Sequence, residues 1–315
     1  MYEKWKGVHT RCAFNMIQEL IPLTRPRTLA AALGPTILGA AFSYYAFGAA
    51  QGTGLAIFHT MLIFLAVVTA QIVANLWNEY KDFKSGLDTG QKVGNAGSIT
   101  RGVITPELII TMIKALMFVP IIIGLYLSAT ITWYYIPVGF LCILISFLYS
   151  GGPKPISRTP FGEISSGIAM GFAIVLITGY AWIRELSLAL LIPAIPSTLL
   201  VGSIMLTNNI RDIRNDESHG RHTLPIVLGR ERALSLMSIS YIFNFIWIIA
   251  WIIIGHMTWF ALLAFLAAPL AFKTIHTLST NTDEFQLDKA MGTTAGAAMI
   301  YQLMWAIGLI MGKLF

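Results

Sequence analysis

Long apolar runs separated by short polar segments dominate the chain. A membrane-spanning helix needs roughly 20 mostly apolar residues. Nine runs approach this requirement, near 28–49, 55–77, 107–128, 132–150, 163–183, 188–209, 234–254, 256–275 and 293–312. The pattern predicts an all-α, polytopic membrane protein with about nine transmembrane helices in one bundle. The leading segment, 1–27, has no signal-peptide pattern and is expected to be a cytoplasmic N-terminal segment. The first apolar run begins near residue 28, so we assign 28–315 to the membrane domain.

Composition excludes the soluble classes of protein. Hydrophobic residues make up 56% of the 315 residues and charged residues only 11%, against roughly 25% charged in an ordinary soluble chain. So few charges cannot cover a soluble surface, and most of the exterior is expected to face a lipid bilayer. The two cysteines provide neither a disulfide framework nor a metal cluster.

Basic residues mark one side of the membrane. Of the 21 Lys and Arg residues, 18 fall in the segments on the N-terminal side of the bundle. Arg184 and Lys313 fall on the other side, and Lys114 lies within a run. Because positively charged loops stay in the cytoplasm, the N-terminus and this face are expected to be cytoplasmic, in the plasma membrane. Topology thus explains most of the net charge of +6, and no nucleic-acid partner is expected.

The scarce acids gather in two long connections on this same side. The first polar row consists of Asn75, Asn78, Glu79 and Asp82. The second polar row consists of Asn208, Asp212 and Asp216. The spacings are i, i+3, i+4, i+7 and i, i+4, i+8, so each row occupies one helix face if its helix continues past the membrane. The first row lies at the end of the second span, and the second row lies at the end of the sixth. This separation by four spans indicates a possible internal pseudo-repeat of spans 1–4 and 5–8.

Two facing rows of carboxylates and carboxamides suit a hard divalent cation. Mg²⁺ takes oxygen ligands and is commonly held by one or two carboxylates together with substrate phosphates. Neighbouring basic residues could instead neutralise each row as a solvated helix end. Two rows with similar spacing occur on the same side of a chain that has only 15 acids. This coincidence favours a cation site over two solvated helix ends.

Each row is followed by a loop with glycine and basic residues. Gly97, Ser98 and Arg101 follow the first row, and Arg221 follows the second. Backbone amides, arginine and hydroxyl groups suit phosphate oxygens, although this motif is weak by itself. A third segment on this side, 149–156, is a Gly-Gly-Pro turn carrying Lys154, and Glu163 follows near a helix start.

These segments resemble the UbiA family of integral-membrane prenyltransferases. The family's motif N-x-x-x-D-x-x-x-D is similar to Asn208, Asp212 and Asp216, and its first part to Asn78 and Asp82. The first copy departs from the pattern, because Gly86 stands where the third acid belongs and the next acid is Asp88. The run from Asn75 to Thr89 and the segments 24–29, 149–156, 159–163 and 220–229 resemble the branch that prenylates 1,4-dihydroxy-2-naphthoate for menaquinone.

The resemblance, over roughly 24–312, implies a nine-helix fold with a cytoplasmic-side active site and a set of roles. A polyprenyl diphosphate is the donor, a small aromatic acid the acceptor, and one or two Mg²⁺ the cofactor. The implied catalytic residues are Asp82, Asp212 and Asp216. The implied metal ligands are Asn75, Asn78, Glu79, Asp82, Asp88, Asn208, Asp212 and Asp216. Diphosphate binding is implied for Lys84, Arg101, Lys154, Arg211 and Arg221, and acceptor binding for Arg25, Tyr149 and Lys154.

The sequence leaves two alternatives open. The same chemistry could act on 4-hydroxybenzoate or another ring instead of the naphthoate, whose prenylation with loss of carbon dioxide gives demethylmenaquinone. A cation-coupled transporter is the alternative of another class, since acidic rows could bind ions. The acids lie at helix ends rather than in mid-span, which favours the enzyme.

Overall fold

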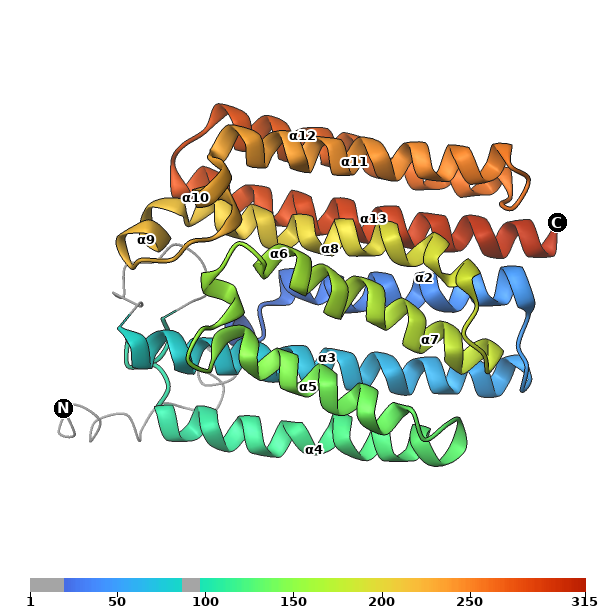
Figure 1. Cartoon of the computed structure of the whole chain (residues 1–315), viewed down its shortest axis with the longest axis horizontal. Helices are drawn as coiled ribbons and strands as arrows, with labels where there is room; N and C mark the ends of the chain where they lie inside the picture. Colours follow the sequence, from blue (N-terminus) through green and yellow to red (C-terminus); the bar gives the residue numbers. More distant parts are fainter. Residues whose placement is uncertain (1–19, 87–96) are drawn as a thin grey trace.

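Long helices aligned along one axis make up most of the computed structural model, which describes residues 20–86 and 97–315 (Figure 1). The long helices are α2 (Ala30–Phe47), α3 (Thr53–Ser85), α4 (Pro106–Thr130), α5 (Tyr135–Ser150), α7 (Ala173–Ile183), α8 (Leu191–Arg211), α11 (Arg230–Ile253), α12 (Ala268–Thr280) and α13 (Glu284–Leu314). The short ones are η2 (Pro26–Leu29), η3 (Ile156–Arg158), α6 (Gly162–Ser166), η4 (Gly167–Phe172), η5 (Leu188–Leu190), α9 (Ile213–Ser218), α10 (Leu224–Leu228) and η6 (Trp259–Ala267).

The all-α prediction is confirmed, since no strand occurs in the described part of the chain. Eight helical segments there are long and apolar enough to cross a membrane, counting continuous pieces such as α6, η4 and α7 together. The remaining predicted span is α5, whose 16 residues are fewer than a typical span has. Helices suit this environment because a bilayer offers no water to satisfy backbone N–H and C=O groups.

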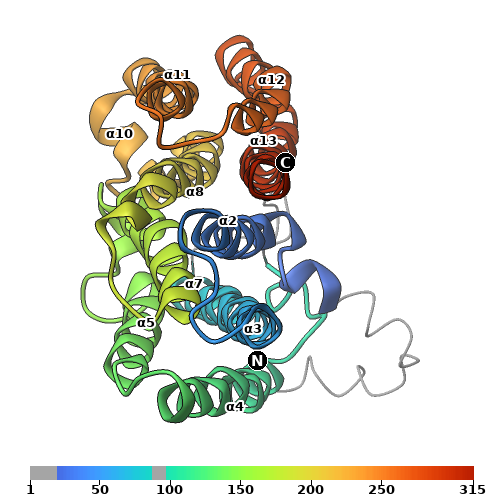
Figure 2. The ribbon, with the colours of Figure 1, turned by 90° about the vertical axis from the view of Figure 1, so that its right-hand side faces the viewer.

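Helix α2 lies at the centre of the bundle. It packs against α3, α7, α8 and α13, and the view along the long axis places it between these helices (Figure 2). Twelve of its 18 residues are buried, most of them small, such as Ala31, Gly34 and Ala40. Small side chains let neighbouring helices approach closely, as is common in membrane bundles.

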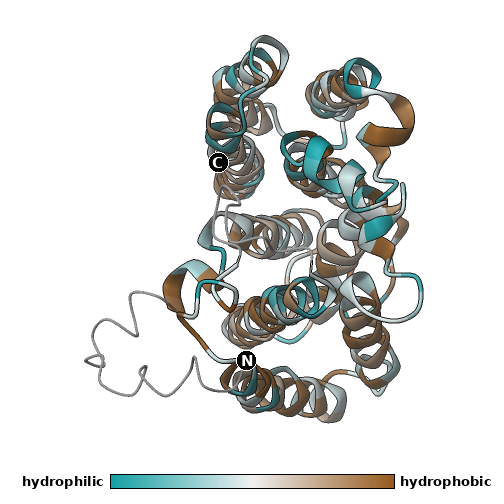
Figure 3. Cartoon of the chain, turned by 90° about the vertical axis from the view of Figure 1, so that its left-hand side faces the viewer, coloured by the Kyte–Doolittle hydropathy of each residue, from teal (hydrophilic) through white to brown (hydrophobic). Residues whose placement is uncertain are grey.

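Two helices carry the polar rows to one end of the bundle. Helix α3 has 33 residues, about 50 Å at 1.5 Å per residue, and therefore extends well beyond a hydrocarbon layer of about 30 Å. It ends at Gly86, which has φ +72°, a left-handed conformation that glycine adopts readily. Seen from the end with α9 and α10, hydrophilic turns cap the near ends of largely hydrophobic helices (Figure 3).

The second row does not continue on one straight helix as its spacing predicts. Helix α8 ends at Arg211, Asp212 leaves the helical conformation with φ −93° and ψ 7°, and α9 begins at Ile213. The i to i+4 backbone bonds nevertheless persist, from Asp212 N to Asn208 O at 3.1 Å and from Asp216 N to Asp212 O at 2.8 Å. Asp and Asn compete with helical hydrogen bonding through their side chains, which explains a break within this Asn- and Asp-rich segment.

A π-helical segment, η4, packs unusually close to α8. A Cβ atom on Gly171 would lie 2.5 Å from the carbonyl oxygen of Ser197, and one on Gly167 would lie 2.5 Å from that of Thr198. Both positions therefore require glycine. The contact fixes the separation between η4 and the helix that carries the second polar row.

We predict that Gly171→Ala destabilises the fold, because the added methyl group meets backbone that cannot move aside. Overpacking of this kind costs about 1–3 kcal/mol. The matched control is Gly292→Ala, at a helix position with open space around it, where alanine is expected to be neutral or stabilising. Thermal unfolding in detergent measures both. Equal unfolding midpoints for the two variants would contradict the close packing.

Candidate active site

A cavity of about 410 Å³ begins at the polar end of the bundle and continues between the helices. Its polar end is lined by Arg25, Asn75, Asn78, Asp82, Asn208, Arg211, Asp212, Arg221 and Asp288. Its apolar body is lined by residues that include Ile63, Val67, Ile123, Leu127, Val138 and Ile177. Both polar rows therefore contribute to one cavity, and the rest of its lining is mostly apolar, with a few hydroxyl side chains such as Ser146 and Ser165.

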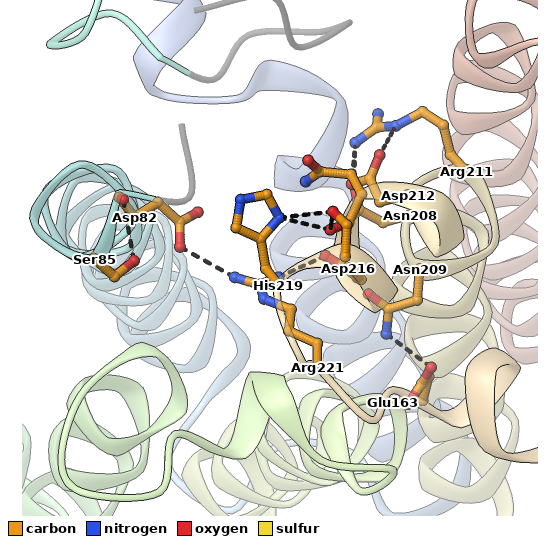
Figure 4. Close-up of polar contacts among 12 residues, drawn as sticks. Asp82, Ser85, Glu163, Asn208, Asn209, Arg211, Asp212, Asp216, His219 and Arg221 are labelled. Carbon is orange, nitrogen blue, oxygen red and sulfur yellow. Dashed lines mark hydrogen bonds and ion pairs between the residues drawn. The ribbon is translucent and has the colours of Figure 1, made fainter. Parts of the chain in front are cut away.

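Arg221 links the two rows directly (Figure 4). Its Nη2 atom lies 3.1 Å from Oδ1 of Asp82 in the first row, and its Nη1 atom lies 3.2 Å from Oδ1 of Asp216 in the second. All three side chains are largely buried, and that of Asp216 is only 2% exposed. Asp216 itself is not among the residues that line the cavity. Burying carboxylates is costly unless a cation compensates them, and this guanidinium compensates one from each row.

Arg211 pairs with the other two acids of the cavity, Asp212 and Asp288, and Figure 4 shows its contacts with Asp212 and Asn208. It donates to both carboxylate oxygens of Asp212, at 2.7 and 2.8 Å, in the forked geometry typical of strong arginine pairs. It also donates to Oδ1 of Asn208 at 2.8 Å and to Oδ1 of Asp288 at 2.9 Å. Arg211 and Arg221, two predicted diphosphate-binding residues, thus both lie in the cavity against the acids.

The N-terminal strap, residues 24–28, positions Arg25 at the cavity. Amide groups of α3 hold the strap: Asn75 Nδ2 donates to the carbonyl of Thr24 at 2.9 Å, and Gln71 Nε2 donates to that of Thr28 at 2.6 Å. Arg25 itself has φ +50°, one of two positive values among non-glycine residues in the described ranges. Such strain persists only where surrounding structure enforces it, and it often marks functional sites.

Glu79 does not line the cavity and instead binds the loop that follows the first row. Its carboxylate accepts hydrogen bonds from the backbone N–H groups of Gly97, Ser98 and Ile99, at 3.1, 2.5 and 3.3 Å. The side chain is only 2% exposed. A carboxylate engaged by three donors is well suited to anchor a loop, a role that the helix spacing alone does not reveal.

Three other predicted diphosphate-binding residues are exposed and lie outside the cavity lining. These are Lys84, Arg101 and Lys154. Lys154 was also predicted to bind the acceptor. The guanidinium of Arg101 donates to Oγ of Ser98 at 3.2 Å. Asp88, a predicted metal ligand, lies outside the described residues.

Of the aromatic residues near the motifs, Tyr149 lines the cavity. Trp77, Tyr80 and Phe147 form a separate cluster, with Trp77 5.7 Å from Tyr80 and 5.2 Å from Phe147 between ring centroids. The indole N–H of Trp77 donates to the carbonyl of Phe147 at 3.0 Å. This cluster fixes the end of α5 against α3, and so positions Tyr149.

Sequence reasoning missed Asp288 and the Glu163–Asn209 pair. Asp288 lies near the start of α13 and lines the cavity. No local pattern singles it out, because Glu107 and Glu231 also stand at the starts of apolar helices. Asn209 donates to Oε1 of the buried Glu163 at 2.8 Å, which ties α8 to α6 behind the second row.

The donors at the polar end fit a divalent cation that brings further ligands of its own. Within the described residues, no three His, Cys, Asp or Glu side chains come close enough to hold a metal by themselves. The carboxylates and carboxamides that do converge are the hard oxygen donors that Mg²⁺ prefers, and Mg²⁺ usually fills its sphere with water and substrate phosphates. The site suits a cation that arrives with an anionic substrate.

Comparisons with known proteins agree with this geometry. The model of the UbiA prenyltransferase family matches residues 32–307. The chain is 36% identical to 1,4-dihydroxy-2-naphthoate octaprenyltransferase of Bacillus subtilis, over 94% of this chain and 93% of that one. Two solved UbiA homologues share the fold at 17% identity. One, from Aeropyrum pernix, has a TM-score of 0.66 over 90% of this chain and 97% of that one. The other, from Archaeoglobus fulgidus and bound to DMAPP and Mg²⁺, has a TM-score of 0.59 over 93% and 99%.

We predict that Glu79→Gln lowers the stability of the protein by about 2 kcal/mol, because a buried charged acceptor of three N–H groups is lost. Thermal unfolding in detergent without divalent cation measures the loss, with Glu107→Gln, in the first turn of α4, as control. Unchanged stability, combined with an altered Mg²⁺ dependence of unfolding, would contradict the anchoring role and favour the predicted role as a metal ligand.

Proposed function

Since the chain belongs to the UbiA prenyltransferase family, we propose that it transfers a polyprenyl group from a polyprenyl diphosphate to 1,4-dihydroxy-2-naphthoate with loss of carbon dioxide. It is an aromatic prenyltransferase embedded in a membrane by several apolar helices. The acceptor proposal is supported by the relative from Bacillus subtilis, which is named for this naphthoate. The product would be the reduced form of demethylmenaquinone.

One observation carries the proposal: residues of both polar rows line the same cavity, whose remaining wall is mostly apolar. A polyprenyl diphosphate has the same division, with an anionic head and a long hydrocarbon tail. The head would lie between α3 and α8, at the arginines and carboxylates, and the tail in the apolar body. An acidic site with no apolar extension would suit an ion-coupled transporter better.

Mg²⁺ would be held by the oxygen donors of the two rows, namely Asn75, Asn78, Asp82, Asn208, Asp212 and Asp216. When bound, it neutralises the negative charge that develops on the departing diphosphate. The solved homologue from Archaeoglobus fulgidus is described as bound to DMAPP and Mg²⁺, which supports the same pairing of ligands here.

Arg211 and Arg221 would bind diphosphate oxygens, for which a guanidinium has the matching forked geometry. Lys84, Arg101 and Lys154 are exposed and would attract the anionic donor at the entrance, a longer-range effect that weakens with salt. The apolar walls exclude water from the allylic cation that remains when the carbon–oxygen bond to diphosphate breaks. Tyr149 could stabilise that cation through its ring by about 0.5–2 kcal/mol.

Arg25 and Tyr149 would bind the naphthoate, with Arg25 facing its carboxylate. The ring carbon forms the new carbon–carbon bond, and departure of carbon dioxide restores aromaticity. No dedicated strong base is needed for that step. The 18 basic residues on one side of the bundle support a plasma-membrane orientation with this end in the cytoplasm, where diphosphate and naphthoate are soluble.

We predict that the purified protein, given Mg²⁺, geranylgeranyl diphosphate and 1,4-dihydroxy-2-naphthoate, forms a product with the added prenyl mass and without the carboxyl group. Mass spectrometry of the product and release of diphosphate measure the reaction. Turnover of 4-hydroxybenzoate but not of the naphthoate would show that 4-hydroxybenzoate is the acceptor. No turnover of any ring, together with cation flux in liposomes, would favour the transporter.

We also predict that Asp82→Asn, Asp212→Asn and Asp216→Asn each lower kcat by at least about 100-fold, because each removes a charge that acts on the leaving group. EDTA should stop the wild-type reaction and added Mg²⁺ restore it. Glu217→Gln is the control, an exposed acid on α9 next to Asp216. A near-normal rate in one aspartate variant would reject the role of that residue.

A further inference from the structure

The two arginines of the cavity have different sets of partners. Arg221 is paired with Asp82 and Asp216, which belong to the two polar rows. Arg211 is paired with Asp212 of the second row and also with Asp288 of α13, which belongs to neither row. Asp288 therefore gives Arg211 a carboxylate partner outside the proposed cation site.

This difference has a consequence when a divalent cation binds the carboxylates of the two polar rows. The ion pairs of Arg221 with Asp82 and Asp216 both involve those carboxylates, so this side chain is expected to turn from them to the diphosphate. Arg211 shares Asp212 with the cation but keeps the Nη1 bond of 2.9 Å to Asp288. A retained carboxylate partner limits the rotamer freedom of an arginine and offsets the cost of keeping its charge in the cavity.

We propose that Asp288 is a positioning residue, which holds Arg211 at the head of the cavity so that its guanidinium meets the diphosphate of the donor. The inference rests on the proposed function, since it presumes a diphosphate bound between the rows. It adds the last helix of the chain to a site that the two motifs alone assign to α3 and α8.

The position of α13 does not depend on Asp288. Buried hydrogen bonds join α13 to α8 deeper in the bundle, between Thr294 and Thr207 at 2.9 Å and between Gln302 and Ser197 at 2.9 Å. Asp283 caps the helix by accepting from the N–H of Gln286 at 3.1 Å. The substitution Asp288→Asn, which keeps the shape and removes the charge, is therefore expected to leave the fold intact.

The test measures the binding of geranyl diphosphate in the presence of Mg²⁺ and without acceptor, by calorimetry on the full-length protein in detergent. We expect Asp288→Asn to raise the Kd about tenfold, the effect of losing one charge-assisted hydrogen bond at the low end of its usual strength. The KM for donor should rise while the KM for acceptor changes less than twofold. Asp288→Glu should recover most of the donor affinity.

The partner of Asp288 is tested by a double-mutant cycle. Because Asp288 acts through Arg211, combining Asp288→Asn with Arg211→Gln should weaken donor binding no further than Arg211→Gln alone. Glu284→Gln, one helical turn before Asp288 on α13, is the matched control and should bind like the wild type. Thermal unfolding of every variant separates a loss of donor binding from a loss of fold.

Wild-type affinity in Asp288→Asn, or fully additive effects of the two substitutions, would overturn the inference. The equal loss of donor and acceptor affinity in Asp288→Asn would overturn it too. If the wild type and Glu284→Gln bind the donor with Mg²⁺, any of these results leaves the proposed function standing. If neither binds it, the proposed function fails and the inference fails with it.

Discussion

The need to neutralise several carboxylates at the polar end of the bundle, in and behind the wall of a largely apolar cavity, governs this structure. Asp82, Asp212, Asp216 and Asp288 come from α3, from the break between α8 and α9, from α9 itself and from α13. Like charges this close repel, and burial penalises each. Arg221 and Arg211 each bridge two of them. The same ion pairs join helices that are distant in sequence. The two arginines therefore both balance the charge and hold the helices together at the polar end.

The membrane explains why this chemistry lies at one end. Unpaired polar groups are too costly in hydrocarbon, so the rows occur where α3 runs past the apolar layer and where α8 gives way to α9. The helices between them leave an apolar cavity below the charged end. A substrate with an anionic head and a hydrocarbon tail meets both environments in one binding mode. A fold of this kind separates the reacting atoms from water while the charged leaving group stays near the aqueous side.

Sequence spacing predicted the helices and several of the residues that line the cavity, because helical periodicity fixes which residues share a face. Asn75, Asn78 and Asp82 share one face of α3 and line the cavity with Asn208 and Asp212, as the spacing implies. The spacing does not predict which groups a side chain contacts in the folded protein. Glu79 lies on the same stripe but receives the backbone of a loop, while Lys84 and Lys154 are exposed. Asp288 was missed because its contact with Arg211 spans 77 residues, a tertiary relation that no local pattern carries.

The claim at the centre of this account is that both polar rows hold the divalent cation or cations bound to the donor diphosphate. Mn²⁺ prefers the same oxygen ligands as Mg²⁺ and is paramagnetic, so its electron paramagnetic resonance reports what surrounds it. With geranyl diphosphate present, the account predicts coupling of bound Mn²⁺ to phosphorus, and at least tenfold weaker Mn²⁺ binding in both Asp82→Asn and Asp212→Asn. Bound Mn²⁺ that lacks coupling to phosphorus, or that responds to a substitution in only one row, would contradict it.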